Sequence, residues 1–151
     1  MAWGARNVIS TQGFSMHPHR GFETITIAFE GSVEHGDSVG NSDIIHPGDV
    51  QWMTAGRGII HEEYHSSAFA KHGGTFEMCQ LWLNLPKRHK MAAPGYQAIT
   101  AAQIPHVPLS EGDGGMADGY VRVIAGSCNG VGGAATTFTP VEVCCRPQNP
   151  I

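Results

Sequence analysis

Short apolar runs, each closed by a glycine or a proline, are the feature that most restricts the fold of this chain. They recur about every 8–12 residues between positions 24 and 85, a spacing typical of a β-sandwich or a β-barrel. In the first strong run, Ile25 and Ile27 alternate with Thr24 and Thr26, so that the two kinds of side chain lie on opposite faces of a strand. Glycine contributes 20 of the 151 residues and proline nine, which provides the many turns that such a fold needs.

The pattern predicts an all-β chain with a single domain over residues 1–143 and an irregular tail over 144–151. One short helix is expected near residues 100–103, within a less periodic stretch. The strands are expected over residues 24–29, 33–35, 43–46, 50–53, 59–64, 75–85, 120–125 and 134–143.

The charge and the apolar pattern argue against two classes of partner. Nine Lys and Arg stand against 13 Asp and Glu, a net charge of −4 without a basic block, so no direct binding to nucleic acid is expected. No membrane association is expected either, because no apolar run reaches the roughly 18 residues that span a bilayer. Without a visible signal peptide, and with Cys144 adjacent to Cys145, we expect reduced thiols and a cytoplasmic protein, or a nuclear one in a eukaryote.

The segment His17-Pro18-His19 places two imidazoles at a spacing that suits a metal ion. It lies just before the first strong strand, and in an extended segment residues two apart point to the same side. Pro18 disfavours a helix at His17 and stiffens the spacer. The segment is therefore a candidate metal-binding dyad.

A later strand repeats this arrangement with a carboxylate, because His61 and Glu63 also lie two residues apart and share a face. Two such dyads on facing strands would supply three neutral nitrogens and one carboxylate. That ligand set suits a divalent first-row transition metal and leaves coordination positions open. The six other histidines are expected at turns or on the surface, although His65 shares the face of His61 and could support it; they are His35, His46, His65, His72, His89 and His106.

Four strings in the chain resemble the pirin family of the cupin superfamily. They are HPHRGFET (17–24), PGDVQWMTAGRGIIH (47–61), LWLNLP (81–86) and MAAPGYQAI (91–99). The resemblance implies a cupin-type antiparallel β-barrel, or jelly roll. It also implies that the metal, Fe(II) before other first-row metals, is held by His17, His19, His61 and Glu63. Glu23, which occupies the position of a glutamate ligand in many other cupins, is not a ligand in pirins and is left out of this set.

The resemblance leaves three functions open. Some pirins resemble flavonol (quercetin) 2,3-dioxygenases, which act on a small aromatic flavonol with dioxygen; Glu63 would then be the general base. Others are iron-dependent regulators that bind a transcription factor or a metabolic enzyme. In the third case the chain is an incomplete and inactive piece. For the enzyme, the apolar walls of the substrate pocket are expected to be Phe14, Met16, Trp52 and Trp82.

Pirins have two cupin domains, and the resemblance covers only the amino-terminal one. The chain also resembles that domain from partway into its amino-terminal region, so a truncated start is expected. Without the second domain, the late strands would leave an apolar face bare, and a second copy of the chain is the economical cover for it. The residues expected on this face are Val121, Val123, Phe138, Val141 and Val143.

We therefore predict a symmetric homodimer. Light scattering at micromolar concentration should give twice the mass of the 16.1 kDa chain. A clean monomer mass would contradict the prediction.

Overall fold

The computed structural model describes residues 2–8, 12–109 and 119–146. The chain divides into two compact units, Met1–Ala101 and Ala102–Ile151, and each is described by itself. Both consist mainly of antiparallel strands, so the all-β prediction is confirmed. Within the described ranges, every helix is too short or too polar to cross a membrane.

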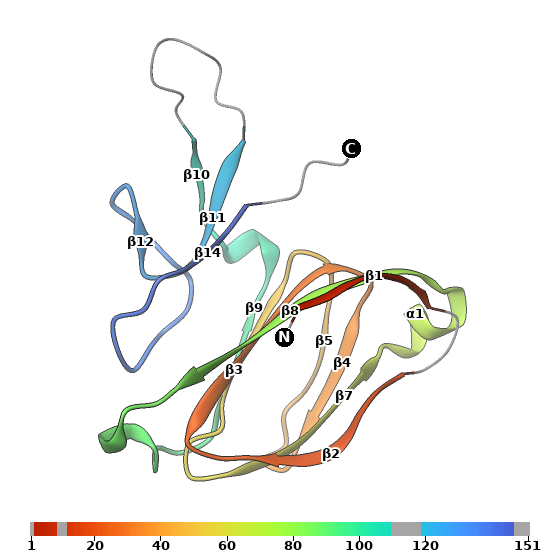
Figure 1. Cartoon of the computed structure of the whole chain (residues 1–151), viewed down its shortest axis with the longest axis horizontal. Coiled ribbons are helices and arrows are strands. Elements are labelled where there is room, and N and C mark those ends of the chain that lie inside the picture. The colour runs from red at the N-terminus through yellow and green to blue at the C-terminus, as the bar shows by residue number, and fades with distance from the viewer. Residues whose placement is uncertain (1, 9–11, 110–118, 147–151) are drawn as a thin grey trace. The chain divides into compact units, whose positions relative to one another are not determined.

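Two antiparallel sheets make up the first unit (Figure 1). The five-stranded sheet runs, in spatial order, β1 (Ala2–Val8), β8 (Gly74–Asn84), β3 (Phe22–Glu30), β6 (Val50–Thr54) and β9 (Gly95–Ile99). The four-stranded sheet contains, in spatial order, β2 (Gly13–His19), β7 (Ile59–His65), β4 (Val33–Asp37) and β5 (Ser42–Ile45). The strands predicted between residues 24 and 85 correspond to β3 to β8, with ends that differ by a few residues.

The inner faces of the two sheets enclose an apolar cluster at one end of the unit. Ala28 and Met78, which are paired on β3 and β8, pack there against Val33 of β4 and Ile45 of β5, with Phe76 beside them. Since these residues come from both sheets, this contact identifies the face of each strand that points inward. On β3 the inward face is that of Ala28, and strand alternation puts Thr24 and Thr26 on it too.

Both faces of β3 are buried, so the alternation of isoleucine and threonine does not separate an inside from an outside. Ile25 and Ile27 lie on the face that points away from the four-stranded sheet, whereas Thr24 and Thr26 point toward it. The alternation predicted the strand correctly. The polar side of the strand nevertheless faces the interior, where it meets the polar residues described below.

β2 and β7 approach each other closely because β2 begins at a glycine. A Cβ atom on Gly13 would collide with the backbone oxygen of Glu63 on the neighbouring strand. A register shift between Phe14 and His17 then brings His17 opposite His61. This shift is a bulge-like irregularity, a feature that often redirects side chains near functional sites.

In the ranges that the structure describes, three short helical elements connect the strands. The α-helix α1 (Ser67–His72) was not predicted from the sequence; it is capped by Ser66, whose hydroxyl accepts a hydrogen bond from the amide of Phe69 at 3.2 Å. A 3-10 helix, η1 (Lys87–His89), follows β8. A second, η2 (Ala101–Gln103), lies where the short helix was expected.

The second unit contains a three-stranded sheet of β10 (His106–Pro108), β11 (Tyr120–Ala125) and β14 (Val143–Cys145), and a small hairpin of β12 (Ser127–Cys128) and β13 (Val131–Gly132). β11 has the bounds that the sequence predicted. The strand predicted over residues 134–143 is wrong, because only Val143 of this segment joins a ladder. Pro140, which has no amide hydrogen to donate, interrupts the segment. Cys144 and Cys145, expected in an irregular tail, belong to β14.

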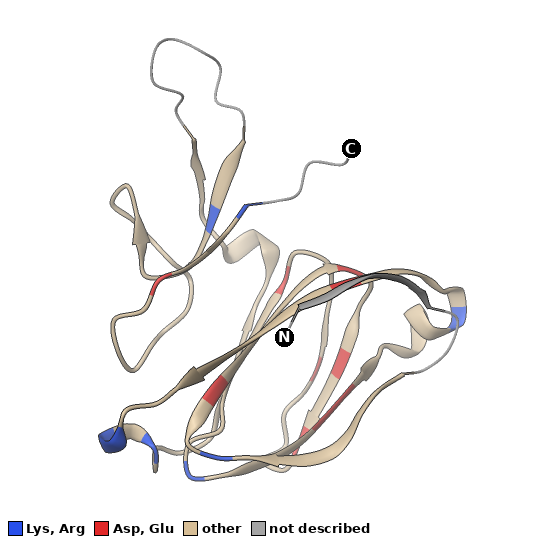
Figure 2. Ribbon diagram, in the orientation of Figure 1, with Lys and Arg blue, Asp and Glu red and all other residues tan. Residues whose placement is uncertain are grey.

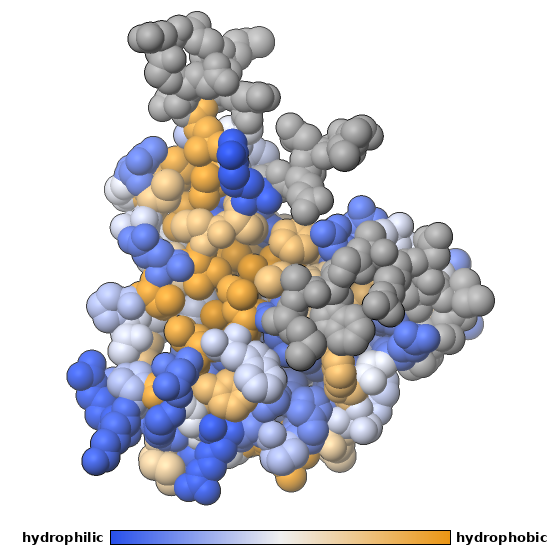
Figure 3. Space-filling model, viewed as in Figure 1, coloured by the Kyte–Doolittle hydropathy of each residue, from blue (hydrophilic) through white to orange (hydrophobic). Residues whose placement is uncertain are grey.

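The prediction of which residues form an apolar dimer face is partly wrong. Val123 and Val143, two of its expected members, are buried within the chain, whereas Phe138 is exposed. Figure 3 shows apolar side chains over the strands of the second unit. Tyr120, Val131 and Phe138 are the large exposed hydrophobic residues described there. The homodimer itself remains a prediction.

Candidate metal centre

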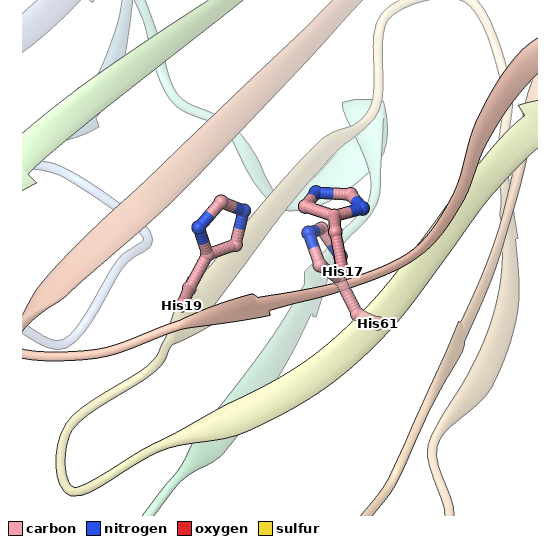
Figure 4. A group of neighbouring side chains, drawn as sticks. All are labelled: His17, His19 and His61. Carbon is pink, nitrogen blue, oxygen red and sulfur yellow. The ribbon is translucent and has the colours of Figure 1, made fainter.

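Antiparallel pairing of β2 with β7 gathers three imidazoles at one point in the first unit. The register pairs His17 with His61 and His19 with Ile59, so the three rings extend from two adjacent strands (Figure 4). The ring centroids of His17 and His61 lie 4.4 Å apart, those of His17 and His19 4.7 Å, and those of His19 and His61 4.8 Å. The extended spacing of His17 and His19, expected from the sequence, is therefore present in β2.

The ring nitrogens are close enough to share one ion. One nitrogen from each of His17, His19 and His61 lies within 4.8 Å of the others. Metal–nitrogen bonds of about 2.0–2.1 Å allow two ligand nitrogens to be up to roughly 4 Å apart, so small side-chain movements bring the three into range. The ring of His17 is also oriented, because its Nδ1 lies 2.8 Å from the carbonyl oxygen of Ser15. A proton on Nδ1 leaves the lone pair of Nε2 available.

His61 provides an independent test of whether these residues suit a metal. Its side chain is fully buried, and in the described part of the chain neither of its ring nitrogens has a hydrogen-bond partner. An unsatisfied buried polar group costs on the order of 1–3 kcal/mol, and here there are two such atoms on one ring. A bound cation would satisfy at least one of them, so the donor set fits a metal ion.

Burial favours the neutral imidazoles of His19 and His61, which is the form that binds metals. Burial, and then charge repulsion from His17, His19 and His35, together lower the pKa of His61 to about 3. Burial, and then repulsion from His17, also lowers the pKa of His19. The lone pairs of both rings therefore stay available in mildly acidic solution.

Glu63 points into the same interior from β7 but is held by the opposite sheet. Its Oε1 accepts hydrogen bonds from Nε2 of Gln51 at 2.9 Å and from the hydroxyl of Thr26 at 3.4 Å, and its Oε2 accepts one from Nε2 of Gln80 at 2.8 Å. Figure 2 shows acidic residues on β3, β4 and β7. Sequence reasoning missed the three donors; the only available signal was a polar residue at an inward position of a largely apolar strand.

The structure brings Glu63 together with His61, although not with all three histidines at once. Ligand atoms of His35, His61 and Glu63 form a second group within 4.8 Å of one another, and His61 belongs to both groups. Since His61 links the two groups, a four-ligand site needs Glu63 to turn toward His17 and His19. The set predicted from the sequence remains a prediction in that respect.

The expectation that His35 lies at a surface turn is wrong. Its side chain is almost fully buried on β4, where its ring stacks on Tyr96 with centroids 4.8 Å apart and its Nε2 lies 3.2 Å from a carboxylate oxygen of Asp37. Burial alone would raise the pKa of Asp37, but hydrogen bonds from Asn41, His35 and Val39 outweigh it and lower the pKa. The inward alternation of Val33, His35 and Asp37 was the missed signal.

Other histidines behave more nearly as expected. His46, His72 and His106 are exposed, and His89 is half-buried. His65 is buried on the inward face of β7, but its ring packs against Phe76 and Phe69, with centroids 4.5 Å and 5.6 Å away. It therefore belongs to an aromatic cluster rather than to the three-histidine group.

The four expected pocket residues fall into different places. Trp82 is 65% exposed and its ring lies 5.5 Å from that of His19, while the exposed ring of Phe14 lies 6.2 Å from that of His17. Met16 is exposed as well. Trp52 does not lie where it was expected. It alternates with Gln51 on β6 and so lies on the opposite face of the sheet from Glu63.

Glu23 also lies on that opposite face. Its carboxylate accepts a hydrogen bond from the hydroxyl of Thr54 at 2.7 Å. Its omission from the ligand set agrees with this position.

The Pirin family model matches residues 1–83. The chain belongs to the pirin family. A provisionally named quercetin 2,3-dioxygenase of Pseudomonas aeruginosa is 52% identical to it over 132 residues, which cover 87% of this chain and 44% of that protein. Pirin of Mus musculus is 43% identical over 129 residues, which cover 85% of this chain and 40% of that protein. The chain thus spans less than half the length of these curated relatives.

Solved structures agree with the cupin-type fold. The crystal structure of a quercetin 2,3-dioxygenase from Acinetobacter baumannii superposes with a TM-score of 0.83 at 51% identity, covering 95% of this chain and 48% of that one. A bacterial pirin from Escherichia coli in complex with nickel(II) gives a TM-score of 0.55 at 28% identity, over 79% of this chain and 51% of that one. The pirin resemblance and the fold class predicted from the sequence are confirmed.

Removing a member of the three-histidine group should abolish most metal binding. His17→Ala or His61→Ala should weaken the affinity for Ni(II) by at least about 100-fold, because losing a ligand costs more than losing a residue that supports one. Isothermal titration and metal analysis of purified protein measure this. His46→Ala, which changes an exposed histidine of the same unit, should bind like the parent chain; an equal loss there would locate the site elsewhere.

The low pKa of His61 predicts an acid-sensitive metal-free protein. Between the unfolded value of about 6.5 and the folded value of about 3, the unfolded chain binds a proton that the folded chain does not. The free energy of unfolding should therefore fall with decreasing pH in that window, by at most about 1.4 kcal/mol per pH unit for one proton.

Urea denaturation with a chelator present, at pH values from 6.5 to 4.5, measures this slope. His61→Asn removes the titrating group, so the stability of this variant relative to the parent chain should rise as the pH falls. Parallel slopes for the two proteins would contradict the prediction.

Proposed function

We propose that this chain binds one divalent transition metal and takes part in dioxygen-dependent oxidation of a flavonol-type aromatic compound. The observation that carries the proposal is the convergence of His17, His19 and His61, with His61 fully buried and both its ring nitrogens without a partner among the described residues. Glu63, which shares the inward face of β7, is the proposed fourth ligand. The crystallised quercetin 2,3-dioxygenase that covers 95% of this chain supports the reaction class.

Fe(II) is our first choice of metal. Three imidazoles and one carboxylate suit iron, manganese, nickel, copper and zinc alike, because neutral nitrogen ligands bind all of these ions. The nickel(II) complex of the Escherichia coli pirin supports a site of this general kind. When bound, the metal would supply Lewis-acid polarisation of the substrate oxygen and redox contact with dioxygen.

Glu63 would remove the proton from the flavonol hydroxyl. Its carboxylate is directed by two amide donors, Gln51 and Gln80, which approach different oxygens from the opposite sheet. Because a carboxylate oxygen can accept more than one hydrogen bond, each keeps capacity for a proton or a metal. A positioned carboxylate of this kind serves as a general base when it comes within hydrogen-bond reach of the substrate hydroxyl.

Aromatic side chains beside the histidines suit a planar substrate. Phe22 lies with its ring centroid 4.9 Å from those of both His19 and Trp82. The exposed ring of Trp82 thus extends an aromatic surface outward from the three-histidine group. A flavonol ring can pack against such a surface through offset stacking, which favours aromatic over aliphatic substrates.

Metal analysis combined with oxygen uptake tests the proposal directly. Protein loaded with Fe(II), and separately with Ni(II), should consume oxygen when quercetin is added, and the flavonol absorbance should decrease in parallel. Metal binding without oxygen uptake would overturn the enzymatic part and leave a non-catalytic metal protein. No metal binding by the parent chain would overturn the whole proposal.

Replacing Glu63 separates its role as a base from its role as a ligand. Glu63→Gln keeps an oxygen that can bind the metal but cannot accept the substrate proton, so turnover should fall by about 100-fold or more while metal occupancy falls less. Oxygen uptake and metal analysis on the same sample give the two values. Unchanged turnover would exclude Glu63 as the base.

A further inference from the structure

Glu63 is held by a row of side chains that crosses three strands. Thr26 of β3 is paired with Gln51 of β6 on one side and with Gln80 of β8 on the other, so the three side chains lie side by side on the inward face. All three donate to the Glu63 carboxylate. The position of this carboxylate is therefore set by the five-stranded sheet, although Glu63 itself belongs to the other sheet.

The two amides of the row are anchored in different surroundings. The Oε1 of Gln51 lies 3.5 Å from the hydroxyl of Tyr96, whose oxygen is also 3.2 Å from a carboxylate oxygen of Asp43. Burial, and then the negative charges of Asp43, Glu63 and Asp37, raise the pKa of Tyr96, which keeps its hydroxyl protonated. This arm of the row therefore ends at the partly buried side chains of Tyr96 and Asp43.

The other arm ends at the surface. The Oε1 of Gln80 accepts a hydrogen bond from the indole Nε1 of Trp82 at 3.2 Å. Trp82 follows two residues after Gln80 on β8, so both side chains lie on the same face of the strand. The indole is 65% exposed, which places one end of this hydrogen-bonded series within reach of other molecules.

Chemistry permits only one orientation of the Gln80 amide. An ionised carboxylate only accepts hydrogen bonds, and an indole N–H only donates. A glutamine between them must turn its NH₂ group toward Glu63 and its oxygen toward Trp82. The indole N–H thus favours the amide orientation that holds Glu63, and without it the amide oxygen loses that partner.

We propose that Trp82 is a positioning residue that acts on Glu63 through Gln80. Its indole N–H orients the Gln80 amide, and the amide in turn fixes Oε2 of Glu63 where the carboxylate can serve the three-histidine group. A molecule that packs on the exposed indole and draws its N–H away from Gln80 loosens the carboxylate. The effect on metal binding rests on the proposed function, whereas the effect on Glu63 does not require a metal.

NMR of the metal-free protein tests the structural part. The side-chain amide signals of Gln80 are assigned by their loss in Gln80→Met, and the carboxylate carbon signal of Glu63 by its loss in Glu63→Gln. Trp82→Phe keeps an aromatic ring beside His19 but lacks the donor, so both sets of signals should shift. Unchanged Gln80 or Glu63 signals would overturn the proposal whether or not the chain binds metal.

A double-mutant cycle with Ni(II) tests the effect on the site. Trp82→Phe should weaken Ni(II) affinity about fivefold, as expected for a hydrogen bond that acts through a second residue. Gln80→Met should weaken it by roughly tenfold or more, since it removes the direct support of a ligand. In the Gln80→Met background, Trp82→Phe should have no further effect, because its route to Glu63 is already broken.

The outcomes separate this proposal from the proposed function. An equal effect of Trp82→Phe in both backgrounds, or none in the parent chain, would overturn the relay while leaving the metal site intact. A parent chain that binds no Ni(II) would overturn the proposed function, and NMR would then decide the relay alone.

Trp52→Phe is the matched control. It also removes an indole N–H, but that group has no hydrogen-bond partner in the described part of the chain and lies on the opposite face of the sheet. Because Trp52 is fully buried, a lower melting temperature is expected. The Glu63 signal and the Ni(II) affinity should stay at the parent values; a shift equal to that of Trp82→Phe would overturn the relay.

Discussion

The antiparallel pairing of β2 with β7 is the contact on which the rest of the site depends. It sets His17 opposite His61 and His19 opposite Ile59, after a register shift that follows Phe14. Because side chains alternate along a strand, a shift of one residue would turn both histidines of β2 away from His61. The close approach at Gly13, where any Cβ would meet the backbone of β7, shows how tightly this pairing is made.

The interior of the first unit combines an apolar end with a polar band. Around Ala28 and Met78 the two sheets pack through aliphatic side chains, whereas Thr26, Gln51 and Gln80 present hydrogen-bond donors to Glu63. Burying a carboxylate is costly unless its oxygens accept hydrogen bonds, and this row meets that need. His61 is different, because among the described residues neither of its buried ring nitrogens has a partner, an arrangement that suits an external cation.

Strand prediction from the sequence succeeded where a turn residue follows a short alternating run, as at β3, β6, β7 and β11. It failed over residues 134–143, where apolar residues alternate around Pro140 but only Val143 joins a ladder. It also misjudged His35, because only the valine is apolar among the alternating positions Val33, His35 and Asp37, and their shared inward face was missed. Whether a polar residue is buried depends on partners that other strands supply. For His35 this partner is Tyr96 of β9, whose ring stacks on the imidazole.

The sequence by itself determined that the chain is all-β and that His17 and His19, like His61 and Glu63, each share a face of an extended strand. Alternation along a strand is a local property that can be seen in the sequence. The resemblance to pirins then indicated which of the alternating residues are the expected metal ligands. Only the tertiary structure decided that His61 meets His17 and His19, that Glu63 is held by Gln51 and Gln80, and that Trp52 faces away while Trp82 does not. These outcomes depend on strand register and on which sheet faces which, and both arise from contacts between segments far apart in the chain.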